Sequence, residues 1–124
     1  MQTTVENIQD VVTALVKGET PLGDIRAHLR DPRAVVRANA LNALIPHAKI
    51  DDGLIEVIVA AAKNPINEIR LMGTISVAHV AIGCLYQTGT TPAVGVATEL
   101  LAAWPESDRG DLLWFLRSEG HMPA

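Results

Sequence analysis

The chain has 124 residues, a formal net charge of -4 at pH 7, 48% hydrophobic residues and only 3% aromatic residues. This length fits one domain with a continuous core and argues against a multidomain enzyme. A single cysteine, Cys84, excludes an intrachain disulfide and any metal or redox motif that needs two cysteines. The core must consist of small and aliphatic side chains, a composition that favours an all-α fold.

The first predicted helix covers about residues 4–17. Thr3 and Glu6 match a capping box, in which each side chain bonds a free backbone N–H at the helix start. Apolar residues then follow at helical spacing as far as Gly18, namely Val5, Ile8, Val12 and Leu15.

Short polar residues followed by proline mark four later helix starts, because proline suits the first helical turn and the preceding side chain caps it. These pairs are Thr20-Pro21, Asp31-Pro32, Asn64-Pro65 and Thr91-Pro92. The sequence predicts further helices near 21–30, 32–47, 52–63, 65–86, 92–103 and 106–118. No segment alternates with period two, so no strand is expected.

Two stretches of the chain repeat at an offset of 33 residues. Pro32 and Pro65 correspond, as do Arg37 and Arg70, and small or apolar residues follow at the same offset. A period of this size is typical of a helical solenoid, in which each unit packs only against its neighbours. We therefore expect one domain over 1–124, with a capping helix (1–18), repeat 1 (20–48), repeat 2 (51–86) and a degenerate repeat 3 (91–118).

The segment from Leu29 to Leu44, with its Asp-Pro turn, Val-Arg pair and following Ala and Leu residues, resembles a HEAT repeat. The match departs in the second unit, where Asn64 replaces the Asp and Gly73 the Ala, and the Val-Arg pair is missing from 105–118. The resemblance implies a right-handed α–α superhelix of about three helical hairpins. It also implies a non-enzymatic scaffold or adaptor that binds another protein, without a cofactor.

Four residues are expected to link the repeats. Arg37 and Arg70 would lie one turn into equivalent helices, where a guanidinium can bond the turn of a neighbouring unit. The turn residues are Asp31 and Asn64. We expect an inter-repeat polar ladder of these four residues. Arg26, Arg30, Arg33 and Arg37 could instead form a small basic cluster at the turn that contacts an acidic partner.

Partner recognition is expected on the concave surface formed by the second helix of each pair. The residues predicted to line it are Asn39, Asn42, Asn67 and Ser76. The alternative is lyase- or chaperone-like binding of a small molecule or cofactor in a groove against the helix 65–86. Gly73, Ser76 and Gly83 would leave room there for close approach.

Aromatic residues gather near the C-terminal end of the sequence. Trp114 and Phe115 are adjacent, so they must point in different directions from the last helix. One should pack inward with Leu112 and Leu116, and the other should lie near the surface. Segment 104–116 is therefore expected either to cap the open end of the stack or to contact a partner or a second copy in a homodimer.

Other classes of function find little support in the sequence. The four histidines are far apart, so neither a metal site nor a catalytic constellation is expected. The acidic net charge disfavours nucleic-acid binding. The longest nearly uncharged run, Leu71 to Tyr86, is too short to cross a bilayer, and the first residues show no secretion signal. A cytoplasmic protein is expected.

Overall fold

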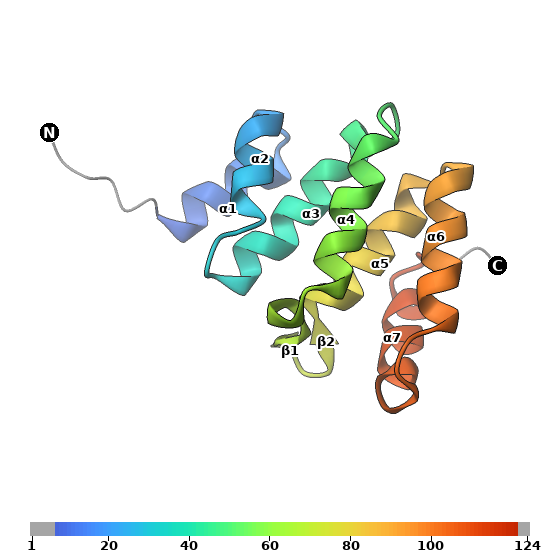
Figure 1. Cartoon of the computed structure of the whole chain (residues 1–124). Coiled ribbons are helices and arrows are strands. Elements are labelled where there is room, and N and C mark those ends of the chain that lie inside the picture. Colours follow the sequence, from blue (N-terminus) through green and yellow to red (C-terminus); the bar gives the residue numbers. More distant parts are fainter. Residues whose placement is uncertain (1–6, 122–124) are drawn as a thin grey trace, which may run out of the picture.

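The computed structural model describes residues 7–121 and confirms the all-α class (Figure 1). The expected capping box of Thr3 and Glu6 lies outside the described residues. The helices are α1 (Ile8–Val16), α2 (Leu22–His28), α3 (Ala34–Ala48), α4 (Gly53–Lys63), α5 (Val77–Thr88), α6 (Thr91–Ala102) and α7 (Glu106–Ser118). A short 3-10 helix, η1 (Pro65–Glu68), and a hairpin of β1 (Arg70–Met72) and β2 (Ile75–Ser76) lie between α4 and α5.

Helices α3 and α5 pack against each other at the centre of the molecule. Both α1 and α2 pack on α3, while α4, α6 and α7 pack on α5. In Figure 1, α2 lies in front of α3, and α4 and α6 lie in front of α5. The central pair supplies much of the aliphatic core, including the fully buried Leu41, Leu44, Ile82 and Leu85.

The two turns that the repeat predicted have the same local structure. Asp31 Oδ1 accepts a hydrogen bond from the backbone N–H of Arg33 at 2.8 Å. Asn64 Oδ1 accepts one from the backbone N–H of Ile66 at 3.1 Å. Both side chains therefore close a turn over two residues, a conformation that Asp and Asn favour.

The prediction of a continuous helix over 65–86 is wrong. After η1, Ile69 is extended with ψ 135°, and the hairpin pairs Arg70 with Ser76 and Met72 with Ile75. Gly73 turns the hairpin with φ +56°, a conformation that favours glycine. An added Cβ at Gly73 would meet open space, so Gly73 does not take the interior place of Ala40.

Helix α5 begins only at Val77, because Ser76 and His79 form a capping box. Ser76 Oγ accepts from the backbone N–H of His79, and His79 Nδ1 accepts from the backbone N–H of Ser76, both at 3.2 Å. The box satisfies two backbone donors at the helix start. From about residue 69 onward, the hairpin and this capping box replace the helix that the 33-residue repeat predicted.

Candidate functional site

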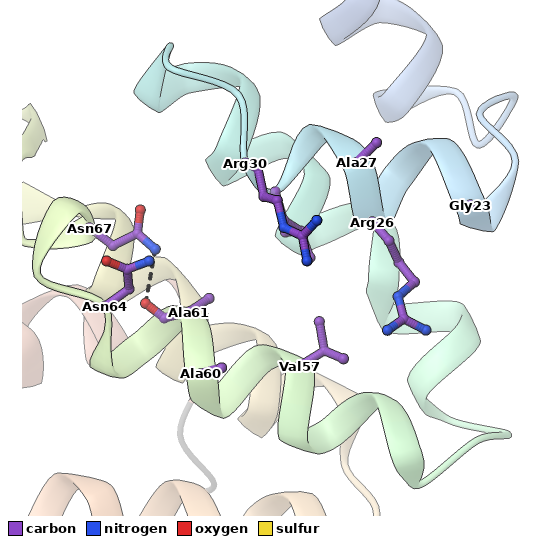
Figure 2. Close-up of a pocket in the computed structure, with 10 residues that line it drawn as sticks. Gly23, Arg26, Ala27, Arg30, Val57, Ala60, Ala61, Asn64 and Asn67 are labelled. Carbon is purple, nitrogen blue, oxygen red and sulfur yellow. Dashed lines mark hydrogen bonds between the residues drawn. The ribbon is translucent and has the colours of Figure 1, made fainter.

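The candidate site is an open groove between α2 and α4 (Figure 2). Helix α2 spans only seven residues and buries Ile25. Helix α4 buries Leu54, Ile55 and Ile58 in the core, on a face other than the one that lines the groove. Small side chains line much of the space between the two helices, so a cavity of about 490 Å³ remains. It is lined by Gly23, Arg26, Ala27, Leu29, Arg30, Val57, Ala60, Ala61, Asn64 and Asn67.

Two arginines give the groove its charge, Arg26 on α2 and Arg30 in the turn that follows this helix. Both side chains are exposed and extend into the space beside α4 (Figure 2). None of the described residues that line the groove is acidic. Within residues 7–121, neither guanidinium takes part in a hydrogen bond or ion pair. The groove therefore carries two positive charges that nothing in the described part of the chain neutralises.

One end of the groove is held rigidly by buried hydrogen bonds. Arg37 Nε donates to Asn67 Oδ1 at 2.8 Å, and Asn67 Nδ2 donates to the carbonyl of Ala61 at 2.9 Å. Arg37 is only 2% exposed and also donates to the carbonyls of Asp31 and Pro32. These bonds join α3, α4 and η1, so the groove has a fixed end wall.

The expected polar ladder forms only in part, and its residues bond partners other than those predicted. Arg37 does link the first Asp-Pro turn to the second unit, but it bonds the backbone of Asp31 and the side chain of Asn67, not Asn64. The Asp31 carboxylate pairs with Arg33. The hydrogen bonds from Arg33 lower the pKa of Asp31, against the opposing effect of burial.

Arg70 does not occupy the position expected from Arg37. It lies exposed on β1, donates to the carbonyl of Thr74 at 2.7 Å and pairs with Asp108 at 2.7 Å. The physical reason is the hairpin, which replaces the helix that would have aligned the two arginines. Arg37 and Arg70 therefore have different roles.

The predicted concave residues do not form one surface. Asn67 and Ser76 are buried in the hydrogen bonds described above. Asn39 donates to the carbonyl of Val35, the local bond of an asparagine within a helix. Asn42 alone lines a second cavity, of about 430 Å³, on the side of α5 that faces α7. Its side chain there accepts a weak bond from the Cys84 thiol at 3.4 Å.

Of the three residues expected to open a groove against the helix 65–86, Ser76 lines a cavity of about 490 Å³ at the start of α5, together with Ala78 and Trp104. Gly73 lies in the hairpin turn and Ser76 caps α5. The space above Gly83 is filled, because a Cβ there would lie 3.1 Å from the Phe115 ring and 3.0 Å from His121. None of these three residues lines the second cavity.

The adjacent aromatic residues point apart, as predicted. Phe115 is 6% exposed and packs against Gly83 and the His121 ring, whereas Trp114 is 59% exposed. Phe115 therefore belongs to the packing of α7 on α5, where it also borders the second cavity. Trp114 is the residue of this pair that a partner can reach.

Sequence reasoning missed a polar junction around Asp108. Its carboxylate accepts from His79 Nε2 at 2.7 Å, Trp104 Nε1 at 2.8 Å and Arg70 Nη2 at 2.7 Å. Burial acts to raise the pKa of Asp108, but the hydrogen bonds from Trp104, His79 and Arg70 outweigh it and bring the pKa down to about 2. The four-residue spacing of Trp104 and Asp108 was the one local signal.

Asp108 ties α5, α7 and the hairpin together, with both carboxylate oxygens already occupied by donors. Burial raises the pKa of the Cys84 thiol to about 12, so the thiol stays protonated. Among the described residues, no group of three or more His, Cys, Asp or Glu side chains is placed to hold a metal ion. No described helix is long and apolar enough to span a membrane.

Comparison of the chain with protein-family models, with curated proteins and with solved structures found no match. The resemblance to HEAT repeats therefore rests on the residues quoted for it.

Proposed function

We propose that the protein is a small non-enzymatic interaction module of the HEAT-like type, which binds a segment of another protein in the groove between α2 and α4. The observation that carries the proposal is the open groove itself, with Arg26 and Arg30 unpaired within the described residues. Arginine is enriched in protein interfaces, where its planar guanidinium forms several directed hydrogen bonds.

The helix order supports a HEAT-like stack. In this proposal, α2 with α3 and α4 with α5 are two repeats, α1 is the cap, and α6 with α7 is the degenerate third unit of a right-handed superhelix. The matching turns at Asp31 and Asn64, and the bond from Arg37 to Asn67, are what two stacked units would share. The groove then lies between the first helices of successive units.

A binding role also accounts for the size and lining of the groove. Its volume of about 490 Å³ falls in the range of ligand pockets, about 300–1,000 Å³. Its floor includes the aliphatic Val57, Ala60 and Ala61, and its polar groups are the arginines and asparagines at the edge. A mostly apolar floor with a few polar groups is the usual make-up of a recognition site.

The proposal contains no catalytic step. The groups with a clearly altered pKa hold structural positions: Asp31 is paired with Arg33, Asp108 is saturated and the Cys84 thiol is buried and protonated. Burial lowers the pKa of His121, opposed by Glu119, but its ring packs on Phe115, away from the groove. We place the module in the cytoplasm, with another protein as its partner.

The test is a quantitative comparison of captured proteins. The immobilised wild-type chain, the double charge reversal Arg26→Glu/Arg30→Glu and the control Arg117→Glu are exposed to a lysate of the source cells. Arg117 is exposed on α7 and outside the groove. We expect wild type and control to retain the same specific proteins, and the double variant to lose them. Equal capture by all three would overturn the proposal.

A further inference from the structure

We infer that the groove between α2 and α4 takes an extended acidic segment of the partner in which two carboxylates are separated by one residue. This inference rests on the proposed function and names the chemistry of the partner. It follows from the spacing of Arg26 and Arg30, from the free donors at the groove and from the absence of any acid in its lining.

The spacing of the two arginines sets the spacing of the carboxylates. Arg26 lies on α2, and Arg30 lies in the turn just after the C-cap residue Leu29, whose backbone is still helical with φ -62° and ψ -17°. Four residues of helical backbone advance by about 6 Å along the axis. In an extended peptide, residues i and i+2 point the same way and lie about 6.6–6.8 Å apart. An acidic residue at each of these two positions would place one carboxylate opposite each guanidinium.

The chain itself contains an example of the expected contact. Arg33 Nε and Nη2 donate to Asp31 Oδ1 and Oδ2 at 2.9 and 2.8 Å, which is the two-bond fork of an arginine with a carboxylate. Within residues 7–121, neither Arg26 nor Arg30 pairs with a carboxylate. The acid on α2, Asp24, lines a different cavity, between α1 and α2.

An extended occupant fits better than a helical one, because it brings main-chain groups that need partners. Asn64 uses Oδ1 to accept from Ile66, and its amide nitrogen donates no hydrogen bond within the described residues. That amide stands at the end of the groove, where it can donate to a peptide carbonyl. A helix already satisfies its own carbonyls, so it would gain little from Asn64.

The lining also favours an acidic peptide over a nucleic acid. Single-stranded nucleic acids bind grooves that combine positive charge with aromatic platforms for the bases. The described residues that line this groove include no aromatic side chain, and the chain as a whole has a net charge of -4. The positive charge is local and limited to two side chains, which suits two carboxylates and not a long polyanion.

The test is a spacing series of fluorescent peptides measured by anisotropy with the wild-type chain. Glycine–serine peptides carry the cores Asp-Ser-Asp, Asp-Asp, Asp-Ser-Ser-Ser-Asp or, as the uncharged control, Asn-Ser-Asn. We expect Asp-Ser-Asp to bind about tenfold more tightly than the other spacings. We also expect its binding to weaken as the salt rises to about 0.15 M.

Matched variants locate the contact. Arg26→Gln and Arg30→Gln should each weaken binding of Asp-Ser-Asp by about tenfold, and Arg117→Gln should leave it unchanged. Equal affinity for all acidic spacings, no effect of either groove variant, or equally tight binding of an oligonucleotide with the same charge would overturn the inference. The spacing series needs only the wild-type protein, so a poorly folded variant would not stop the test.

The two proposals fail in different ways. If the double charge reversal loses the captured proteins but peptide spacing has no effect, the groove is the binding site and the acidic motif is wrong. If capture does not depend on Arg26 and Arg30, the proposed function fails as well.

Discussion

Arg37 and Asn67 are 30 residues apart in the chain, yet Arg37 Nε donates to Asn67 Oδ1 over 2.8 Å in a buried hydrogen bond. The same guanidinium bonds the carbonyls of Asp31 and Pro32. One side chain thus fixes the first turn and connects it to the segment that follows α4. The end wall of the proposed binding groove depends on this contact.

Arg37→Ala should therefore destabilise the protein more than Arg33→Ala. Loss of Arg37 leaves several buried acceptors unsatisfied, at a cost of about 1–3 kcal/mol in the free energy of unfolding. Arg33 is partly exposed, and without its side chain Asp31 Oδ1 still accepts from the backbone N–H of residue 33, so this loss should cost less, about 0.5–1.5 kcal/mol. Urea unfolding of the two variants measures the difference. Equal midpoints would show that the Arg37 bonds contribute little.

Asp108→Asn should lower stability at neutral pH by about 1–3 kcal/mol, because an amide cannot accept bonds from three donors. Asp111→Asn is the matched control, since Asp111 lies on the same helix and its carboxylate is 4.0 Å from Arg70. Thermal unfolding followed by circular dichroism compares the variants. If Asp111→Asn were as unstable as Asp108→Asn, the loss of stability would come from removing a negative charge from α7 and not from the hydrogen bonds of Asp108.

The pH dependence of stability should also reveal Asp108. Its folded pKa, about 2, is below the ordinary 3.8, so its contribution is complete above about pH 4 and is lost as the pH falls toward 2. The free energy of unfolding of the wild type should decline more steeply over this interval than that of Asp108→Asn. Parallel curves for the two proteins would contradict the assignment.

Gly83→Ala should be clearly less stable than Gly95→Ala. Both glycines are helical, and alanine improves helix propensity by about 1 kcal/mol. At Gly95 the new methyl group meets nothing within 4 Å, so this gain should appear in full. At Gly83 it meets Phe115 and His121 at 3.1 and 3.0 Å, and overpacking costs about 1–3 kcal/mol. Two unfolding curves of equal stability would mean that α7 shifts freely on α5.

Phe115→Ala and Trp114→Ala should separate packing from surface contact. Phe115 is buried, and its truncation should cost about 3–5 kcal/mol. Trp114 is exposed, so its truncation should change stability by about 0.5 kcal/mol or less. Light scattering on the Trp114→Ala protein tests the homodimer alternative. A fall in mass from dimer to monomer would place a second copy on this surface.

Much of the helical arrangement could be predicted because its signals are local. The Asp31 and Asn64 turns, the α4 segment and the last two helices all follow from caps, prolines and apolar spacing. The hairpin could not be predicted from the 33-residue offset. The sequence signals for it were Gly73, which takes a positive φ in the turn, and Ser76 three residues before His79, a capping box with histidine in place of Glu or Gln. The 33-residue repeat gave these residues a different interpretation.

The candidate site was only partly accessible from sequence. Arg26 and Arg30 were recognised as members of a basic cluster, but the groove depends on how far α2 stands from α4. That separation is a tertiary property of two helices whose core residues, Ile25 and Ile58, are both buried. The prediction of a concave binding surface is wrong for Asn67 and Ser76. Both side chains form hydrogen bonds inside the structure.

The most direct test of the account is to map where an acidic peptide binds, using amide correlation spectra of the isotope-labelled protein. On titration with the Asp-Ser-Asp peptide, we predict that the signals that move are those of the groove, above all Gly23, Ala27, Ala60 and Asn64. Signals of Asn42 and Gln87, in the second cavity, should stay in place. Movement confined to Asn42 and Gln87, or no movement at all, would contradict the claim that the protein binds its partner between α2 and α4.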